Sequence, residues 1–285
     1  MSNIKEIKRK ILSISSVIKT TEAMKTISFI KLRKSKKLLS HINKYSSSIE
    51  QLFQHIIGDK ENLNKNRYFF SYKYNKKNKL FIVITSDRGL CGSFNSLIFD
   101  KICKIIQKEE TCLFFSIGKK GLDFLSRRYA AMYEYNKNKS FDYKGISIFV
   151  KKLIEDFLSQ KISSIYLIYN RIKRSLFQEI IVEKILPIDI QIKEKTSKYN
   201  YFILETSKKE ILDHLIPKLM SVKLFKSLLE SHTSEHAARM ISMHKSTENA
   251  YAIQHNLMLN YNKERQTTIT KEILEIIGGL EALNK

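Results

Sequence analysis

The apolar residues at the start of the chain recur in steps of three and four. Five isoleucines set the pattern and a looser series resumes further on, giving Ile4, Ile7, Ile11, Ile14, Ile18, Leu39, Ile42, Ile49, Phe53 and Ile56. A stripe of this period lies on one face of an α-helix and needs a partner helix to cover it. Since no glycine or proline occurs before Gly58, we predict one uninterrupted helix of about 57 residues.

The end of the chain holds a second long helical stretch. No glycine or proline lies between Pro217 and Gly278, a span of about 60 residues. Its seam uses softer and smaller residues, namely Met240, Met243, Thr247, Ala250, Ile253 and Leu257. We expect the two terminal helices to pair antiparallel, with the middle region inserted at one end of the pair. Two separate helices of an ordinary bundle are the alternative.

The middle of the chain has a different pattern. Short runs rich in β-branched and aromatic residues predict strands at 79–85, 112–117 and 162–170, with helical segments such as 94–109 and 149–159 between them. This alternation indicates a small parallel α/β layer, to which residues 177–190 add one or two edge strands. The predicted fold is of the mixed α+β class: a long antiparallel coiled coil (1–62 and 206–285) with an inserted Rossmann-like α/β domain (63–205).

Charge narrows the choice of partner. Lys and Arg total 51 against 28 Asp and Glu, a net charge of +23, which calls for nucleic acid, an anionic membrane surface or an acidic protein. The first 40 residues carry 11 of these cations against Glu6 and Glu22. A basic helix of this kind can track the phosphates of a nucleic acid or dock on acidic protein loops, and composition does not separate the two.

The cysteine pattern and the lengths of the apolar runs limit where in the cell the protein can work. Cys91, Cys103 and Cys112 form no C-x-x-C pair, so neither a disulfide framework nor a cysteine zinc site is expected. The first residues lack the apolar region of a signal peptide and the Arg-rich and Ser-rich character of an import sequence, and no apolar run approaches the roughly 18 residues of a membrane span. We therefore expect a soluble or peripheral protein that is made where it works.

Two short patterns raise the question of catalysis or nucleotide binding. His232, Glu235 and His236 fit the H-x-x-E-H pattern of one class of zinc peptidases, but they fall on the predicted coiled-coil helix with no obvious cleft around them. Gly89 and Gly92, after the first strand, give only G-x-x-G, which is neither the dinucleotide fingerprint nor a P-loop; GKKG at 118–121 is equally weak. Histidines on a solvated or interface face, and tight turns fixed by glycine, are the preferred interpretations.

Three stretches carry a family resemblance: residues 7–34 (IKRKILSISSVIKTTEAMKTISFIKLRK), 84–96 (ITSDRGLCGSFNS) and 230–283, which ends in EILEIIGGLEAL. In order and spacing they closely resemble the signature segments of the gamma subunits of F-type (rotary) ATP synthases. Within the last stretch the resemblance is carried by Glu230, Ser231, Ser234, Glu235, Ala238, Arg239, Met240 and Met243. His232 and His236 lie outside it, which argues that the peptidase pattern is accidental. Residues 123–150 match no family segment.

The resemblance implies a central-stalk rotor in a proton-translocating ATP synthase. The two terminal helices would form a shaft that couples ion-driven rotation to conformational change in the catalytic beta subunits. Its partners would be three alpha and three beta subunits, the epsilon subunit and the membrane c-ring, at the cytoplasmic face of a bacterial cell membrane. No catalytic site, metal or cofactor is expected in the chain. A basic coiled-coil protein that binds nucleic acid is the alternative.

The resemblance also points to particular contacts with the beta subunits. Acidic beta loops are expected near Met24 and Lys25, with nearby cations supplying complementary charge, and polar residues of the C-terminal helix match family positions that touch beta. The predicted coupling contacts are Met24, Lys25, Lys31, Arg33, Lys34, Arg239, Gln266, Thr270 and Glu272. Plain solvated positions are the alternative for these polar residues.

Overall fold

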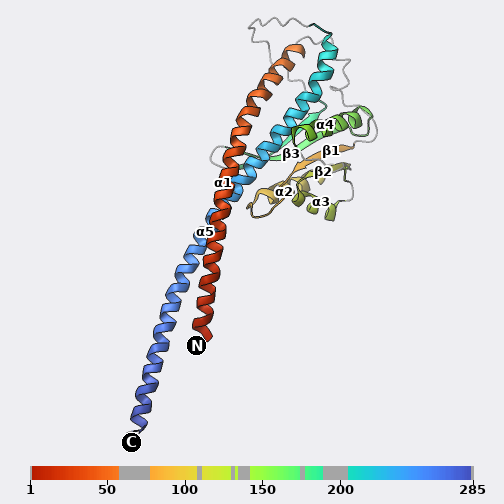
Figure 1. Cartoon of the computed structure of the whole chain (residues 1–285). Helices are drawn as coiled ribbons and strands as arrows, with labels where there is room; N and C mark the ends of the chain where they lie inside the picture. Colours follow the sequence, from red (N-terminus) through yellow and green to blue (C-terminus); the bar gives the residue numbers. More distant parts are fainter. Residues whose placement is uncertain are drawn as a thin grey trace. The chain divides into compact units, whose positions relative to one another are not determined.

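The structure is a computed structural model that describes residues 2–57, 78–107, 111–129, 132–133, 142–173, 177–188 and 205–283. The chain forms two compact units, each described separately below: residues 1–30 with 239–285, and residues 31–238. We call the first the helical pair and the second the sheet unit. Helix α1 (Ser2–Ile57; red to orange in Figure 1) and helix α5 (Lys208–Leu283; cyan to blue) contribute to both units.

The sheet unit contains a four-stranded mixed sheet in the order β2-β1-β3-β4. Strands β1 (Lys79–Ile84), β2 (Cys112–Ile117) and β3 (Ser164–Ile172) are parallel, with Lys79 opposite Cys112 on one side and opposite Ser164 on the other. Strand β4 (Gln178–Leu186) pairs antiparallel with β3 at the edge. The predicted strands and their parallel arrangement are therefore confirmed, and residues 177–190 supply one antiparallel edge strand within the described chain.

Helices cover both faces of this sheet. Helix α4 (Tyr143–Leu158) packs on one face through Phe149, Leu153 and Phe157, where α1 and α5 also contribute buried residues. Helices α2 (Phe94–Ile106) and α3 (Lys119–Arg128) cover the other face, where Phe94, Ile98 and Leu125 lie against Phe81 and Val83 of β1. Successive residues of β1 thus enter different cores, because side chains alternate across a strand. Figure 1 shows the sheet between these helices.

The seam of α1 keeps one phase along the whole helix. Buried or half-buried positions follow steps of three and four from Ile4 to Ile56. Between the two predicted apolar series these positions hold the polar residues Thr21, Lys25, Ser28 and Ser35, with Leu32 as the one apolar residue among them. Only one such phase can face a partner continuously. The break in the apolar pattern is therefore a change of side chain, and the seam itself continues.

Helix α5 continues beyond the stretch that is free of glycine and proline. Pro217 and Gly278 bound that stretch, and the helix runs through both, from Lys208 to Leu283. Pro217 lacks the N–H that would bond to the carbonyl of Asp213, yet Asp213 is exposed, so water can satisfy that carbonyl. Around the proline, Leu212, Ile216 and Leu219 are buried in the core of the sheet unit. Packing of this apolar face outweighs the local cost of the proline.

Candidate functional site

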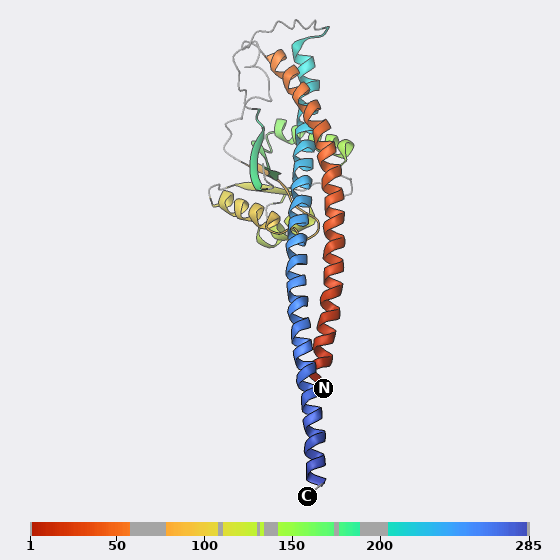
Figure 2. The ribbon, with the colours of Figure 1, turned by 90° about the vertical axis from the view of Figure 1, so that its left-hand side faces the viewer.

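The helical pair is an antiparallel two-helix contact between residues 2–30 of α1 and residues 239–283 of α5. Moving forward along α1 from Thr21 to Lys25, the partners move backward along α5 from Thr247 to His244: Thr247 Oγ1 donates to Thr21 Oγ1 at 2.8 Å, and Lys25 Nζ donates to His244 Nδ1 at 3.2 Å. Figures 1 and 2 show the two helices side by side in both views. This pairing confirms the predicted antiparallel coiled coil.

The seam of this pair is soft and partly polar. Met243, Thr247 and Ala250 are buried on α5, and Thr247 is only 5% exposed. A prediction for this seam was wrong at one position: Ile253 is 48% exposed, and the half-buried residue is Gln254. A strict alternation of three and four from Met243 reaches Gln254, and the helix holds this phase even though the apolar side chain lies one residue earlier.

The last part of α5 has no covering element among the described residues. Every residue from Ile269 to Leu280 is exposed, although an apolar stripe continues through Ile269, Ile273, Ile276, Ile277 and Leu280, with exposed fractions of 46 to 64%. Figures 1 and 2 show this blue end of α5 extending beyond the N-terminal end of α1. An exposed apolar stripe at helical spacing marks a surface for another protein chain.

The nine predicted contact residues fall into three groups. Lys31, Arg33 and Lys34 are exposed on the part of α1 in the sheet unit, and their side chains make no hydrogen bond or ion pair with other described residues. Lys25 is half-buried at a seam position of the helical pair, and Met24 is half-buried next to it. The C-terminal group comprises Arg239, Gln266, Thr270 and Glu272.

The C-terminal group does not form one cluster. Arg239 is only 8% exposed, whereas Gln266, Thr270 and Glu272 are all exposed. Gln266 and Thr270 lie one turn apart, and Thr270 Oγ1 donates to the Gln266 carbonyl at 2.9 Å. Glu272 comes two residues later, roughly 200° around the helix, so it presents a different side of the shaft. The three exposed residues can contact partner subunits directly, whereas very little of the Arg239 side chain is accessible.

The histidine pattern lies within the unbroken helix α5. His232 Nδ1 is 3.6 Å from Glu235 Oε2, and the rings of His232 and His236 lie 6.4 Å apart. Glu235 is buried rather than directed into an open cleft. Over the part of the chain that the structure describes, no group of three or more His, Cys, Asp or Glu side chains is placed to hold a metal ion.

The glycine-bearing turn at the start of α3 serves packing. The first three amides of α3 are occupied: Lys119 N donates to Asp87 Oδ1 at 3.0 Å, Lys120 N to the Ser86 carbonyl at 3.1 Å, and Gly121 N to Thr85 Oγ1 at 2.9 Å. A Cβ on Gly121 would lie 2.7 Å from Thr85 Oγ1, so only glycine allows this approach. The turn after β1 caps α3, and these amides are not available to a phosphate.

A row of buried polar residues on α5 was not evident from periodicity. Ser227, Glu230, Thr233 and Ser234 are all buried in the sheet unit. Burial raises the pKa of Glu230 above its ordinary value of 4.5, against the opposing effect of Lys226, Arg171 and a hydrogen bond from Tyr169. Glu230 Oε2 and Ser234 Oγ, one turn apart, have no hydrogen-bond partner in the described structure. These buried residues mark the part of α5 that other elements of the sheet unit enclose. Because the residues are polar, the sequence did not indicate that this part is buried.

Comparison with known proteins shows to which family this chain belongs. The family model described as ATP synthase matches residues 3–283. The ATP synthase gamma chain of Christiangramia forsetii is 38% identical over 290 residues, covering the whole of both chains, and that of Cytophaga hutchinsonii is 39% identical over 300 residues with the same full coverage. The chain belongs to the ATP synthase gamma-chain family. The family expected from the resemblance is therefore confirmed.

Solved structures support the same fold. In the cryo-EM structure of the Euglena gracilis mitochondrial ATP synthase (OSCP/F1/c-ring, rotational state 3), a chain with 19% sequence identity matches with a TM-score of 0.63, covering 99% of this chain and 95% of that one. A chain of the central stalk and c-ring of the Tetrahymena thermophila mitochondrial ATP synthase matches with a TM-score of 0.55 at 20% identity, covering 80% and 99%. Among the described helices of this gamma chain, none is long and apolar enough to cross a membrane.

Proposed function

We propose that this gamma chain couples ion-driven rotation to conformational change in the beta subunits through the surface of its helical pair. Three alpha and three beta subunits surround the shaft, while the epsilon subunit and the membrane c-ring bind the rest of the chain. The complex is peripheral to the cytoplasmic face of a bacterial cell membrane through that ring. Catalysis belongs to the beta subunits, and the gamma chain contributes no catalytic group, metal or cofactor.

The observation that carries this proposal is the uncovered end of α5. Its apolar stripe from Ile269 to Leu280 is exposed along its whole length, so the isolated chain pays a free-energy cost that an apolar sleeve of other subunits removes. Aliphatic side chains make few directional bonds, so this surface can slide within such a sleeve. The polar residues beside the stripe then distinguish one rotational position from another.

The shaft selects states by differential contact. Gln266 and Thr270 face one side of α5 and Glu272 another, so chemically identical beta subunits around the shaft meet different surfaces. A contact made in one beta state and absent in another shifts the equilibrium between them, about tenfold for each 1.4 kcal/mol of difference. The exposed cations Lys31, Arg33 and Lys34 provide charge complementary to acidic beta loops.

The test begins with assembly. The chain is co-expressed with the alpha and beta subunits of its own organism, and the purified complex is examined by native mass spectrometry and ATP hydrolysis. One gamma chain per three alpha and three beta subunits is expected. Deletion of residues 266–285, or Arg239→Ala combined with Gln266→Ala, should abolish ATP hydrolysis by the complex. Asn260→Ala, which changes an exposed residue on the same helix, should leave ATP hydrolysis unchanged.

Two results would contradict the proposal. If the chain stays outside the alpha-beta ring and purifies with nucleic acid in a salt-dependent manner, the basic part of α1 is a nucleic-acid surface. If the chain assembles but the C-terminal deletion leaves ATP hydrolysis by the complex intact, the exposed end of α5 is not the coupling surface.

A further inference from the structure

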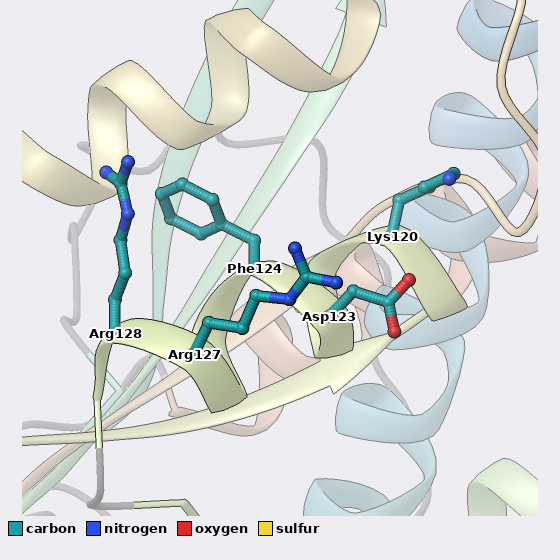
Figure 3. A pocket seen from close by; sticks show the side chains of 5 residues that line it. All are labelled: Lys120, Asp123, Phe124, Arg127 and Arg128. Carbon is teal, nitrogen blue, oxygen red and sulfur yellow. The ribbon is translucent and has the colours of Figure 1, made fainter.

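Helix α3 carries a basic pocket that the shaft function does not use. The pocket has a volume of about 300 Å³ and is lined by Lys120, Asp123, Phe124, Arg127 and Arg128. Figure 3 shows all five side chains extending from α3, with Asp123 between Lys120 and Arg127. Three cations against one carboxylate make this a strongly positive site on the sheet unit.

Two of the cations have no partner within the described chain. The side chains of Lys120 and Arg127 make no hydrogen bond or ion pair with any described residue. Arg128 is held differently: its guanidinium lies 4.8 Å from the centre of the Phe124 ring, which in turn stacks on Phe99 of α2 at 4.1 Å. Phe124 and Arg128 are therefore fixed by packing on α2, while the charges of Lys120 and Arg127 are not held by any described residue.

The site does not have the construction of a phosphate cradle. Phosphate sites at helix ends use free backbone amides, and the first three amides of α3 are already bonded to the turn after β1. Lys120, Phe124 and Arg127 instead follow one another at intervals of one helical turn, with the two cations roughly 10 Å apart along the axis. Two cations at this spacing, unpaired within the described chain and with the carboxylate of Asp123 between them (Figure 3), match a ligand whose own negative charges are spaced in the same way.

We propose that this face of α3 binds an acidic amphipathic helix of another protein chain. Such a helix carries two carboxylates two turns apart, which pair with Lys120 and Arg127, and an apolar side chain midway between them, which contacts the edge of Phe124. Asp123 repels a third carboxylate between these two. The recognition pattern is therefore acid, apolar, acid at one-turn intervals.

A designed peptide tests the spacing. The probe is a fluorescent stapled helical peptide with Glu, Leu and Glu one turn apart, and its control has the same composition in scrambled order. Both are titrated onto the purified complex of the gamma chain with alpha and beta subunits, and anisotropy is recorded. We expect the spaced peptide to bind and Lys120→Gln with Arg127→Gln to weaken binding about fivefold to tenfold, as two exposed ion pairs predict.

A matched charge control separates this site from general basicity. Lys104→Gln with Lys151→Gln removes the same charge from exposed positions on α2 and α4, and should change the affinity by less than about twofold because distant charges are screened. Equal binding of the scrambled peptide, or equal loss in the control variant, would show only a general affinity for anions. Displacement of the peptide by inorganic pyrophosphate at equal concentration would assign a phosphate site instead.

A natural partner already seated on α3 is detected by photo-crosslinking. The photoreactive residue p-benzoylphenylalanine replaces the exposed Ser126, next to the pocket, in the full rotary complex. The expected adduct is an acidic helical segment of another subunit, and it should fall severalfold with Lys120→Gln and Arg127→Gln but not with the α2 and α4 control. Absence of both the adduct and peptide binding would overturn the proposal.

Discussion

The helical pair and the sheet unit hide their residues to very different degrees. In the sheet unit, large aromatic and aliphatic side chains such as Phe94, Phe115 and Phe149 are completely enclosed. In the helical pair the α5 side of the seam is made of Met243, Thr247 and Ala250, which pack against the α1 seam and its isoleucines, and the last turns of α5 are exposed. Since buried apolar area is the main source of folding free energy, the sheet unit supports its own fold and the helical pair is completed by its partners.

The difference follows from what each unit must do. A tightly packed core resists change, because each methylene that is lost or added costs free energy. A shaft that turns inside other subunits must present its surface to each of them in succession, so its stability is best shared with that surface. In the proposed function, the exposed apolar residues at the end of α5 are the surface that partner subunits cover, and the enclosed core of the sheet unit supplies rigidity.

The largest effect should come from the core of the sheet unit. Phe149→Ala removes a fully buried ring that packs on Phe115 at 4.8 Å, and we expect the free energy of unfolding to fall by about 3 to 5 kcal/mol. Urea unfolding of the full chain measures it. The neighbouring Ile148, 47% exposed on the same helix, is the control, and Ile148→Ala should cost less than about 1 kcal/mol. Equal losses would mean that the core is not where stability resides.

The sequence predicted the elements of this core better than their surroundings. Residues 112–117 were assigned to a strand with correct bounds because they combine β-branched and aromatic residues within a short run. The start of α4 at Tyr143, six residues before the predicted one, was missed, since its first turns are mixed in polarity and contain Gly145, even though Asp142 precedes them. Packing on the sheet, which is a long-range property, extends the helix there.

The candidate site was predictable in position but not in environment. The periodicity located both helices, and the resemblance supplied the contact residues, yet neither indicated that Arg239 is buried or that Gln254 takes the seam position of Ile253. Both depend on what packs beside α5. The α3 pocket was also missed, because residues 123–150 matched no family segment and the spacing of Lys120 and Arg127 has meaning only once α3 is seen as a helix.

Acidity should act on the sheet unit through Glu230. Burial raises its pKa in the folded state, so the folded chain holds this proton more tightly than the unfolded chain. Its favourable contribution is complete below the ordinary value of 4.5 and is lost as pH rises through the raised folded pKa. Glu230→Gln, which remains neutral, should therefore increase stability at neutral pH relative to the native chain, with little gain at pH 4.

The measurement for Glu230 is the urea midpoint of the full chain at acid and neutral pH. Glu155→Gln, an exposed carboxyl on α4, serves as the control and should shift the two midpoints equally. A decrease in stability on Glu230→Gln at neutral pH would show that the cations and Tyr169 outweigh the cost of burial, and that Glu230 is charged in the folded chain.

A smaller effect is expected in the helical pair. Thr21→Val with Thr247→Val removes both partners of the 2.8 Å hydroxyl pair while keeping their shape, which is usually neutral or stabilising. We expect amide hydrogen exchange at residues 14–28 and 240–254 to slow about threefold to fivefold, consistent with a gain of up to about 1 kcal/mol in local stability. Thr267→Val, at an exposed threonine, is the control. Faster exchange in the double variant would show that the hydroxyl pair is itself a stabilising contact.

The smallest effect distinguishes two adjacent residues of α5. Gln254 occupies the seam and Ile253 faces outward, so Gln254→Leu should strengthen the helical pair by a fraction of a kcal/mol, about twofold slower exchange, while Ile253→Gln should leave exchange unchanged. In the assembled complex the order should reverse, because an outward isoleucine on the shaft can meet a neighbouring subunit and a seam residue cannot. Hydrogen exchange of the free chain and hydrolysis by the complex therefore test different faces of the same helical turn. If Ile253→Gln instead loosens the free helical pair, α5 is turned by one residue about its axis relative to the seam through Met243, Thr247 and Ala250.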